Sequence, residues 1–310
     1  MLLRVADHLY WMGRYIERAE NTARAVEGAY LSSLLPKGYA LEEWDGLLGI
    51  LGQRDRFPES RRSAAIQELL RFVTLDLENP SSILSSLRAA RENGRATCGT
   101  ISPEAWESLN ALWLDLSEID PSRLISNGTP SLLARVNEGT QLFRGVIQTK
   151  LDRDEVAQWT GLGLFLERAD YIIRILRARC PFLFKAAKGD AAYYSSMALL
   201  RWAGAVEAYR KLYRNGVTPR QVIELLVLNE ESQCSLHACL DRVNTFLSGY
   251  SNGMGGNAAL VATELHIQFH EPWDQDLSEP DLSSRLADVG VGLHGLTEEI
   301  DRWFQGTPCA

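Results

Sequence analysis

Apolar side chains recur at intervals of three and four residues along almost the whole chain, which is the spacing of one face of an α-helix. We find no convincing run in which β-branched and polar residues alternate, as they do in a half-buried strand. Turn signals divide the pattern into roughly ten or eleven helical segments. The sequence therefore predicts an all-α protein, folded as a multi-helix bundle in a single domain over residues 1–310.

The strongest turn signals are short steps with proline or glycine, which end one helix and often begin the next. They lie at Leu35–Gly38, Phe57-Pro58, Asn79-Pro80, Ser102-Pro103, Asp120-Pro121, Asn127–Pro130, Cys180-Pro181, Asn215-Gly216, Thr218-Pro219 and Ser248–Asn257. We expect the Asn79 side chain to cap the helix that follows it, with Pro80 at the first helical position, where a missing N–H does no harm.

One stretch of sequence occurs twice. LYWMGRYIERAENTAR, at 9–24, returns as WTGLGLFLERADYIIR at 159–174. A shift of 150 places Gly13, Glu17, Arg18, Ala19 and Arg24 on Gly163, Glu167, Arg168, Ala169 and Arg174, and the same shift places Leu75, Asn79 and Ser82 on Leu225, Asn229 and Ser232. We infer an internal duplication into halves 1–125 and 150–310 with approximate two-fold symmetry, and we expect a cavity between the repeats.

The repeated segment has an apolar and a polar side when it is drawn as a helix. The apolar side carries Val5, Met12, Tyr15, Ile16, Ala19, Ala23 and Val26, and in the second copy Leu162, Phe165, Leu166, Ala169, Ile173 and Leu176. The polar side carries Arg14, Glu17, Arg18, Asn21 and Arg24. Glu20 with Arg24, and Asp170 with Arg174, are ion pairs four residues apart in the favourable order.

Three interpretations of this polar side are open. It is a solvated face held by ion pairs within the helix, or the two copies pack together with Glu17 and Arg18 bridging to Glu167 and Arg168. In the third interpretation Arg14, Glu17, Arg18 and Arg24 surround a polar cavity that binds a carboxylate, a phosphate or a peptide end, because arginine forms bidentate bonds with such groups.

A second candidate anion site is the helix that begins near Asn79. Ser81, Ser82 and Ser85 lie in its opening turns and Arg88, Arg91 and Arg95 follow, so free N–H groups, hydroxyls and guanidinium groups could serve one anion. The alternative is ordinary capping followed by an exposed basic side. The counterpart after Asn229 carries Glu230 and Glu231, which would repel an anionic ligand.

Composition narrows the class of protein. The 310 residues are 45% hydrophobic and 23% charged, and the net charge of -8 argues against a broad surface for binding nucleic acid. The five cysteines are odd in number and include no Cys-x-x-Cys pair, which argues against a disulfide framework and a structural zinc site. No apolar run has the length of a signal peptide or a membrane span, so we expect a cytoplasmic protein without a membrane partner.

Other candidate chemistry is weaker. His266 and His270, four residues apart, could share a metal, but the zincin order is absent and Pro272 ends the helix at once. In CSLHAC, at 234–239, we interpret His237 and the two cysteines as core residues. The glycine-rich Ser248–Asn257 lacks the Lys-Ser/Thr of a phosphate-binding loop, so we interpret it as a mobile connection. We therefore expect no metal and no cofactor.

Several motifs together resemble one known family. They are LYWMGRYIERAENTAR, NPSSILSSLRAARENGR at 79–95, WESLN at 106–110, LFLERADYIIRIL and EAYRKLY. This combination resembles the bacterial alpha-E domain family over essentially the whole chain. Members are typically encoded beside, or fused to, a circularly permuted ATP-grasp protein and often a transglutaminase-like peptidase, which implies a role in ATP-dependent peptide or amide ligation.

The resemblance also implies which residues matter. The matching positions are Glu17, Arg18, Glu20, Arg24, Asn79, Ser81, Ser82, Arg91, Arg95, Glu167 and Arg168. The chain departs from the family where relatives usually have Pro-Arg-Ser after the second asparagine, because it reads Gln233-Cys234-Ser235 there. The missing arginine puts an anion site in the second half in doubt.

The resulting functional hypothesis is an accessory protein of an ATP-grasp ligase, which docks to the ligase or presents its peptide or amino-acid substrate. One alternative is an enzyme in its own right, with Glu17 or Glu167 as general base and Arg18 or Arg168 holding a carboxylate. Another alternative is a purely structural adaptor whose repeated faces serve only packing.

Overall fold

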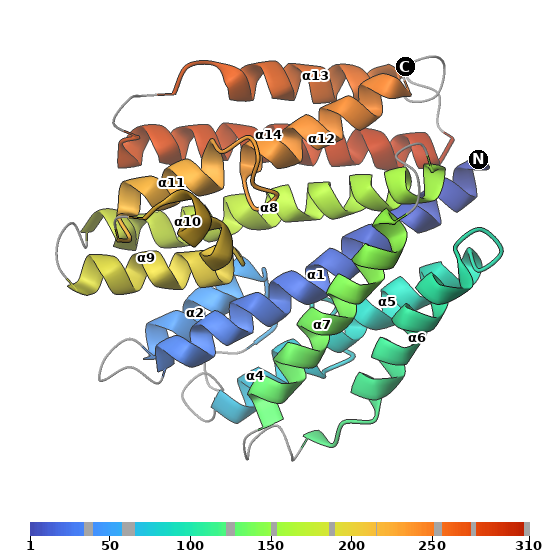
Figure 1. Cartoon of the computed structure of the whole chain (residues 1–310), viewed down its shortest axis with the longest axis horizontal. Coiled ribbons are helices and arrows are strands. Elements are labelled where there is room, and N and C mark those ends of the chain that lie inside the picture. The colour runs from blue at the N-terminus through green and yellow to red at the C-terminus, as the bar shows by residue number, and fades with distance from the viewer. Residues whose placement is uncertain are drawn as a thin grey trace. The chain divides into compact units, whose positions relative to one another are not determined.

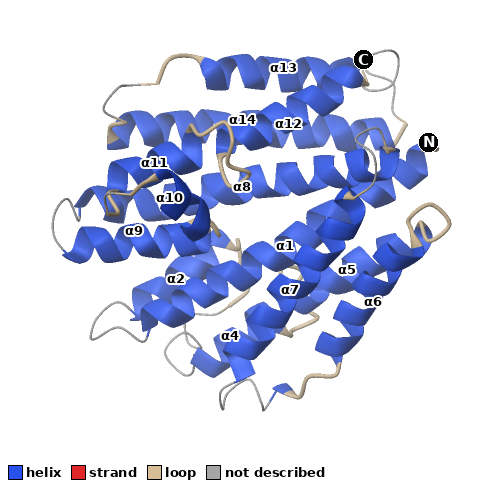
Figure 2. Ribbon diagram, viewed as in Figure 1, coloured by secondary structure: helices blue, strands red, loops and turns tan. Residues whose placement is uncertain are grey.

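The computed structural model describes residues 1–33, 40–57, 66–121, 128–149, 154–185, 190–214, 216–250, 256–273 and 277–306. These residues form thirteen helices and no strand, as Figure 2 shows. The all-α prediction is confirmed, whereas the expected ten or eleven helices are too few. Two of the missed boundaries are single glycines with positive φ, Gly52 and Gly204, which end helices without proline or an Asn-Gly step.

The chain divides into two compact units, Met1–Leu164 and Phe165–Ala310. Unit 1 contains α1 (Leu3–Ser33), α2 (Ala40–Ile50), α4 (Ile66–Thr74), α5 (Ile83–Ala96), α6 (Pro103–Ser117), α7 (Gly128–Gln148) and the start of α8 (Glu155–Lys185). Unit 2 contains the rest of α8 with α9 (Asp190–Trp202), α10 (Val206–Leu212), α11 (Pro219–Val227), α12 (Leu236–Gly249), α13 (Gly256–His270) and α14 (Glu279–Phe304). Figure 1 labels these helices.

Helix α1 is the central element of unit 1. It packs against α5, α7, α2 and α4, while α6 packs against α5 and α7. The predicted apolar side of α1 is buried at Met12, Ile16, Ala19 and Ala23. Because neighbouring helices cover α1 on several sides, its burial extends beyond the apolar stripe that the sequence pattern predicts.

Two glycines bring the backbones of α1 and the start of α8 into contact within unit 1. A Cβ atom on Gly13 would lie 2.1 Å from the carbonyl oxygen of Thr160, and a Cβ atom on Gly163 would lie 2.0 Å from the carbonyl oxygen of Tyr10. No side chain fits at such distances, so both positions require glycine. The contact is reciprocal, because each glycine faces the residue three places before the other.

Unit 2 is built around α12. This helix packs against α11 and α13, α13 packs against α14, and α9 packs against α10 and α11. The hydroxyl of Tyr171 on α8 donates to the carbonyl oxygen of Trp202 at 3.0 Å, and both side chains are buried. Helix α8 is thereby fixed to the end of α9.

The start of α5 differs in detail from the expected cap. The N-cap is Ser82, whose Oγ accepts from the backbone N–H of Ser85 at 3.1 Å and donates to the carbonyl oxygen of Asp76 at 2.7 Å. Asn79 lies before the helix, where its Oδ1 accepts from the N–H of Ser81 at 3.0 Å. The prediction that Asn79 caps the helix is wrong, because its side chain closes the preceding turn instead.

The start of α12 has the same cap. Ser235 Oγ accepts from the N–H of Ala238 at 3.0 Å and donates to the carbonyl oxygen of Asn229. Ser82 and Ser235 are therefore equivalent in role and lie 153 residues apart, whereas the uniform shift of 150 pairs Ser82 with Ser232. The turns at Gly52 and Gly204, with φ of 65° and 64°, lie 152 apart. The offset grows along the chain because loops absorb extra residues.

Helix lengths also recur in the order of the chain. Helices α1 and α8 each have 31 residues, α4 and α11 each have 9, α5 and α12 each have 14, and α6 and α13 each have 15. Ser102 and Thr218 cap their helices, each with proline in the first turn, as their turn signals predict.

The Cys180-Pro181 step does not end a helix. Helix α8 continues through Pro181 to Lys185. Proline removes one backbone hydrogen bond, but in the last turn this costs little, and Leu183 beyond it is buried in the core. The predicted turn Leu35–Gly38, and 251–255 of the glycine-rich connection, lie outside the described residues.

Candidate functional site

The polar side of α1 is buried, not solvated. Glu17 and Glu20 are both 0% exposed, and Asn21 and Arg14 are buried as well. The interpretation of a solvated polar face is therefore wrong for these residues. A fully buried carboxylate needs a paired cation, because removing an unpaired charge from water costs several kcal/mol.

The cation comes from α7. Arg144 donates from Nη2 to Glu20 Oε1 at 2.7 Å and from Nη1 to Glu17 Oε2 at 3.4 Å. Arg24 donates to the same Glu20 oxygen at 2.5 Å, which confirms the predicted pair four residues apart. Sequence reasoning missed Arg144; the available signal was a single arginine beside Phe143 on a helix with apolar residues at regular spacing.

This arrangement determines what the acids can do chemically. Glu17 and Glu20 share the guanidinium of Arg144 and Glu20 also pairs with Arg24, so two cations face the two carboxylates inside the unit and the acids are poorly placed to accept a proton from a substrate. Some hydrogen-bonding capacity is unused: Glu20 Oε2 and both ends of the Asn21 amide have no hydrogen-bond partner among the described residues.

Arg14 and Arg18 are held by aromatic rings. Arg14 donates to the hydroxyl of Tyr10 at 2.8 Å, and its guanidinium carbon lies 5.5 Å from the centre of the Trp11 ring. The guanidinium carbon of Arg18 lies 5.3 Å from the ring centre of Tyr15. Each of these two arginines, four residues apart on α1, thus has an aromatic ring beside its guanidinium group.

The second copy of the motif, on α8 in unit 2, has different surroundings. Glu167 and Arg168 are buried, and Arg168 donates to the carbonyl oxygen of Gln233 at 3.1 Å. Arg174 pairs with Asp170 at 2.8 Å and lies 4.0 Å from Glu167. Arg168 thus joins α8 to the turn before α12, at the position where the sequence departs from the family pattern.

The polar residues before α5 take part in hydrogen bonds within unit 1. Asn79 donates from Nδ2 to the carbonyl oxygen of Phe72 at 2.9 Å. Ser81 Oγ accepts from Gln53 Nε2 at 3.0 Å, and Ser82 serves as the cap. Gln53, which sequence reasoning missed, is buried and follows the positive-φ glycine at the end of α2.

Of the three arginines of α5, Arg88 lies against the turn before the helix, where it donates to the carbonyl oxygen of Leu77 at 3.4 Å, and the other two lie further along. Arg91 donates to Asn110 Oδ1 at 2.7 Å and lies over the Trp113 ring at 4.6 Å from its centre. Arg95 pairs with Glu92 at 3.0 Å. The structure therefore separates Arg91 and Arg95 from Ser81 and Ser82, and binding of an anion by this set stays a prediction.

A Glu-Arg pair thus occurs on both α1 and α8, and its glutamate is buried in each. Residues 1–304 match the Alpha-E family, which is described as a predicted alpha-helical domain with a conserved ER motif. The chain belongs to the Alpha-E family. The expected resemblance is confirmed, and the described motif agrees with the Glu-Arg pairs of α1 and α8.

Two mycobacterial proteins that are similar to the Alpha-E chain are described as uncharacterised. Mb2597 of Mycobacterium bovis and Rv2567 of Mycobacterium tuberculosis are each 21% identical to it over 319 residues. The match covers 96% of this chain but 36% of each relative, so the Alpha-E chain spans about a third of the length of the relatives it matches. No solved structure matches it significantly.

Among the free cysteines that the structure describes, Cys180 and Cys239 are buried, Cys234 is partly exposed and Cys98 is exposed. Burial raises the pKa of the Cys180 thiol to about 12, with a smaller contribution from Glu279, so this thiol is inert at neutral pH. His266 and His270, considered above as a weak metal pair, lie beside His237 and Asp241. His237 and Cys234 are partly exposed, so the interpretation of CSLHAC as core is wrong for these two residues and confirmed for Cys239. Among the described helices, none has an apolar stretch long enough to cross a bilayer.

Proposed function

We propose that this chain is a non-catalytic helical module that docks to an ATP-grasp ligase and presents its peptide or amino-acid substrate in the cytoplasm. The observation that carries the proposal is the burial of Glu17 and Glu20 against Arg144. Of the two candidate bases, Glu17 pairs with Arg144, and Glu167 is buried 4.0 Å from Arg174, so we assign to the module the binding of other molecules.

The partnership with a ligase rests on the family resemblance and on the length of the relatives. The match covers only 36% of each mycobacterial relative, so there the domain belongs to a much longer polypeptide. We take this as support for a module that acts together with another part of a longer protein.

We further infer that the module arose by duplication of a helical half. The recurrence of helix lengths, serine caps and glycine turns in the same order supports this inference. The reciprocal contact of Gly13 and Gly163 supports a local two-fold axis between the two glycines. Glycine at both positions follows if the ancestral half packed against a copy of itself.

The test combines association and product formation. The chain and the ATP-grasp protein encoded with it are purified separately and together, and their complex is measured by light scattering. Both are then incubated with ATP and a peptide mixture, and products are identified by mass spectrometry. We expect a stable complex and an ATP-dependent product that needs the ligase, with a yield that rises when the chain is added.

Variants separate the module from an enzyme. Glu17→Gln and Glu167→Gln should lower the melting temperature but leave product yield unchanged well below it, and the exposed Glu298→Gln serves as control. Loss of product in Glu17→Gln or Glu167→Gln, with melting temperature and complex unchanged, would establish a catalytic chain. Absence of a complex and of any effect on yield would contradict the partnership.

A further inference from the structure

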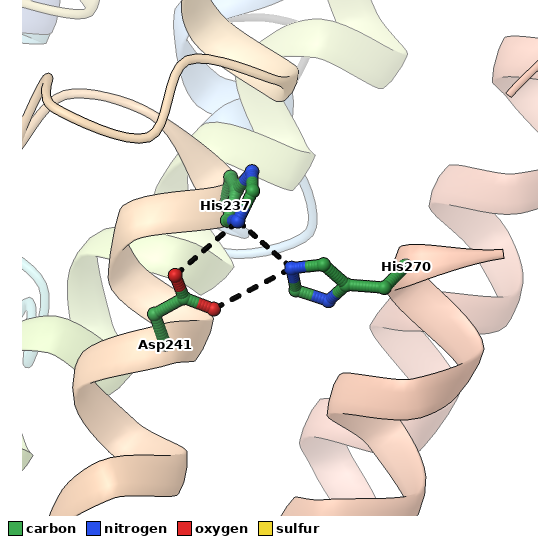
Figure 3. A group of neighbouring side chains, drawn as sticks. All are labelled: His237, Asp241 and His270. Carbon is green, nitrogen blue, oxygen red and sulfur yellow. Dashed lines mark hydrogen bonds and ion pairs between the residues drawn. The ribbon is translucent and has the colours of Figure 1, made fainter. Parts of the chain in front are cut away.

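Four side chains of unit 2 converge from two neighbouring helices. Helix α12 contributes His237 and Asp241, and α13 contributes His266 and His270. Each pair is separated by four residues, which places both members on the same face of their helix. Figure 3 shows His237, Asp241 and His270 with their polar atoms turned toward one another.

The distances within the cluster suit a metal ion. His237 Nε2 lies 2.8 Å from His270 Nε2 and 3.2 Å from Asp241 Oδ2, and His270 Nε2 lies 3.6 Å from Asp241 Oδ1. In a tetrahedral zinc site with Zn–N bonds of about 2.0–2.1 Å, neighbouring donor atoms are about 3.3 Å apart. The two imidazole nitrogens and the two oxygens of Asp241, one facing each imidazole, are therefore close enough together to contact one such ion.

The hydrogen bonds of the two imidazoles fix their tautomers. His237 Nδ1 lies 3.1 Å from the carbonyl oxygen of Leu228, and His270 Nδ1 lies 2.8 Å from that of His266. A carbonyl oxygen only accepts, so each Nδ1 carries the proton and each Nε2 of a neutral ring has a lone pair. Two lone pairs 2.8 Å apart repel each other unless a proton or a metal ion lies between them. Hydrogen bonds from Nδ1 to a carbonyl are also typical of metal-bound histidines.

The remaining histidine supports the carboxylate. His266 Nε2 donates to Asp241 Oδ1 at 2.7 Å, which orients the carboxylate toward the two imidazoles. The ring of Phe269 contacts the rings of His237 and His270, at centre-to-centre distances of 5.9 and 5.5 Å. One apolar wall and one hydrogen-bonded carboxylate thus hold the two rings in place.

We propose that His237, Asp241 and His270 bind one divalent transition-metal ion, with His266 as a positioning residue. Two imidazoles and one carboxylate favour zinc, iron, cobalt or nickel over magnesium and calcium, which prefer oxygen ligands. The three ligand side chains are partly exposed, so an additional coordination position faces solvent and can take water or a ligand. The proposal does not depend on the partnership with a ligase.

The cluster is confined to the second half of the chain. At the offset of 153 that relates the caps of α5 and α12, the ligand positions correspond to Leu84, Arg88 and Ser117. A leucine and an arginine cannot bind a cation. A metal site here would therefore be a property of unit 2, and one ion per chain is expected.

Titration with the metal alone tests the proposal. The full chain is freed of metal with a chelator, and Zn²⁺ binding is measured by calorimetry and Co²⁺ binding by visible absorption. We expect one ion per chain at micromolar or lower concentration, with the absorption of a low-coordinate cobalt site. Absence of stoichiometric binding of either ion at pH 7.5 would overturn the proposal.

Variants define the site. His237→Ala and His270→Ala should each weaken binding at least about 100-fold, and His266→Gln by about 10- to 100-fold, while far-ultraviolet circular dichroism confirms that each folds. His294→Ala is the matched control, because this exposed histidine also faces a carboxylate four residues away, Glu298 at 3.3 Å. Unchanged affinity in the double variant His237→Ala/His270→Ala would overturn the proposal, as would imidazole NMR signals that report a shared proton and do not respond to added metal.

Discussion

The two copies of the motif Glu-Arg-Ala-acid differ in how deeply their last acid is buried and in how many cations contact it. In α1 the last acid, Glu20, is 0% exposed and is bonded by Arg24 and by Arg144 from α7. In α8 the corresponding Asp170 has a side chain that is 44% exposed and pairs with Arg174. In both copies the sequence places the acid and its arginine four residues apart. The acid is buried in α1, where α7 supplies Arg144 as a second cation, and it is partly exposed in α8.

The largest effect is expected at the glycines, where the two copies agree. Gly13→Ala and Gly163→Ala should each destabilise the protein by at least about 3 kcal/mol, because a methyl group would overlap a backbone carbonyl that cannot move aside. Urea denaturation measures the loss. Gly161→Ala is the control: nothing lies within 4 Å of its Cβ position, so it should change stability by no more than about 1 kcal/mol.

A loss in only one of the two glycine variants would break the comparison. Such a result would show that the α1–α8 contact is not reciprocal, and the inferred local two-fold axis would fail with it.

The next largest loss of stability is expected to differ between the two copies of the Glu-Arg motif. Arg144→Met should cost about 3 kcal/mol, because it leaves two buried carboxylates with one fewer cation. Arg174→Met should cost about 1 kcal/mol, because water screens Asp170 and the buried Glu167 lies 4.0 Å from Arg174, at the limit of an ion pair. Thermal and urea unfolding measure both. Equal losses would mean that burial of the first copy contributes nothing extra to its ion pairs.

A smaller and equal effect is expected at the two caps. Ser82→Ala and Ser235→Ala should each cost about 1 kcal/mol, because each removes the acceptor for a first-turn N–H. Ser232→Ala, at the position that the uniform shift of 150 pairs with Ser82, is the informative control. If it costs more than Ser235→Ala, the offset of 153 is the wrong register.

The smallest effect concerns pH. Burial raises the pKa of Asp7 above its ordinary 3.8, although His8 and a hydrogen bond from Trp11 lower it. The ionised carboxylate therefore disfavours folding above the raised pKa, and this penalty disappears as the pH falls below 3.8. Asp7→Asn should raise the melting temperature by up to about 2 °C at pH 7 and by nothing near pH 3. A gain that persists at pH 3 would contradict this explanation.

Local features of the fold followed from the sequence. The helical class, the apolar side of α1, the caps at Ser102 and Thr218 and the Glu20–Arg24 pair depend on residues within about one turn of each other. Such features are encoded in the spacing of side chains along a single helix. The recurrence of the Glu-Arg motif was visible for the same reason, but the separation of the two serine caps, 153 residues and not 150, was not.

Features that join different helices did not follow from the sequence. Arg144 lies more than a hundred residues from Glu20, and Gln53 meets Ser81 only because a glycine turn ends α2 beside α5. The pair His237 and Asp241 and the pair His266 and His270 are each unremarkable on their own helix. Helix packing decides which helix faces contact each other, and the spacing of residues within a single helix does not reveal its packing partner.

The central claim is that the acids of the first motif stabilise the fold through α7 and are not poised to react. A double-mutant cycle tests it directly, with Glu20→Gln, Arg144→Met and the double variant unfolded in urea, beside the same cycle for Asp170→Asn and Arg174→Met. We predict a coupling of about 1–3 kcal/mol for Glu20 with Arg144 and no more than about 0.5 kcal/mol for Asp170 with Arg174. A coupling near zero between Glu20 and Arg144 would contradict the account.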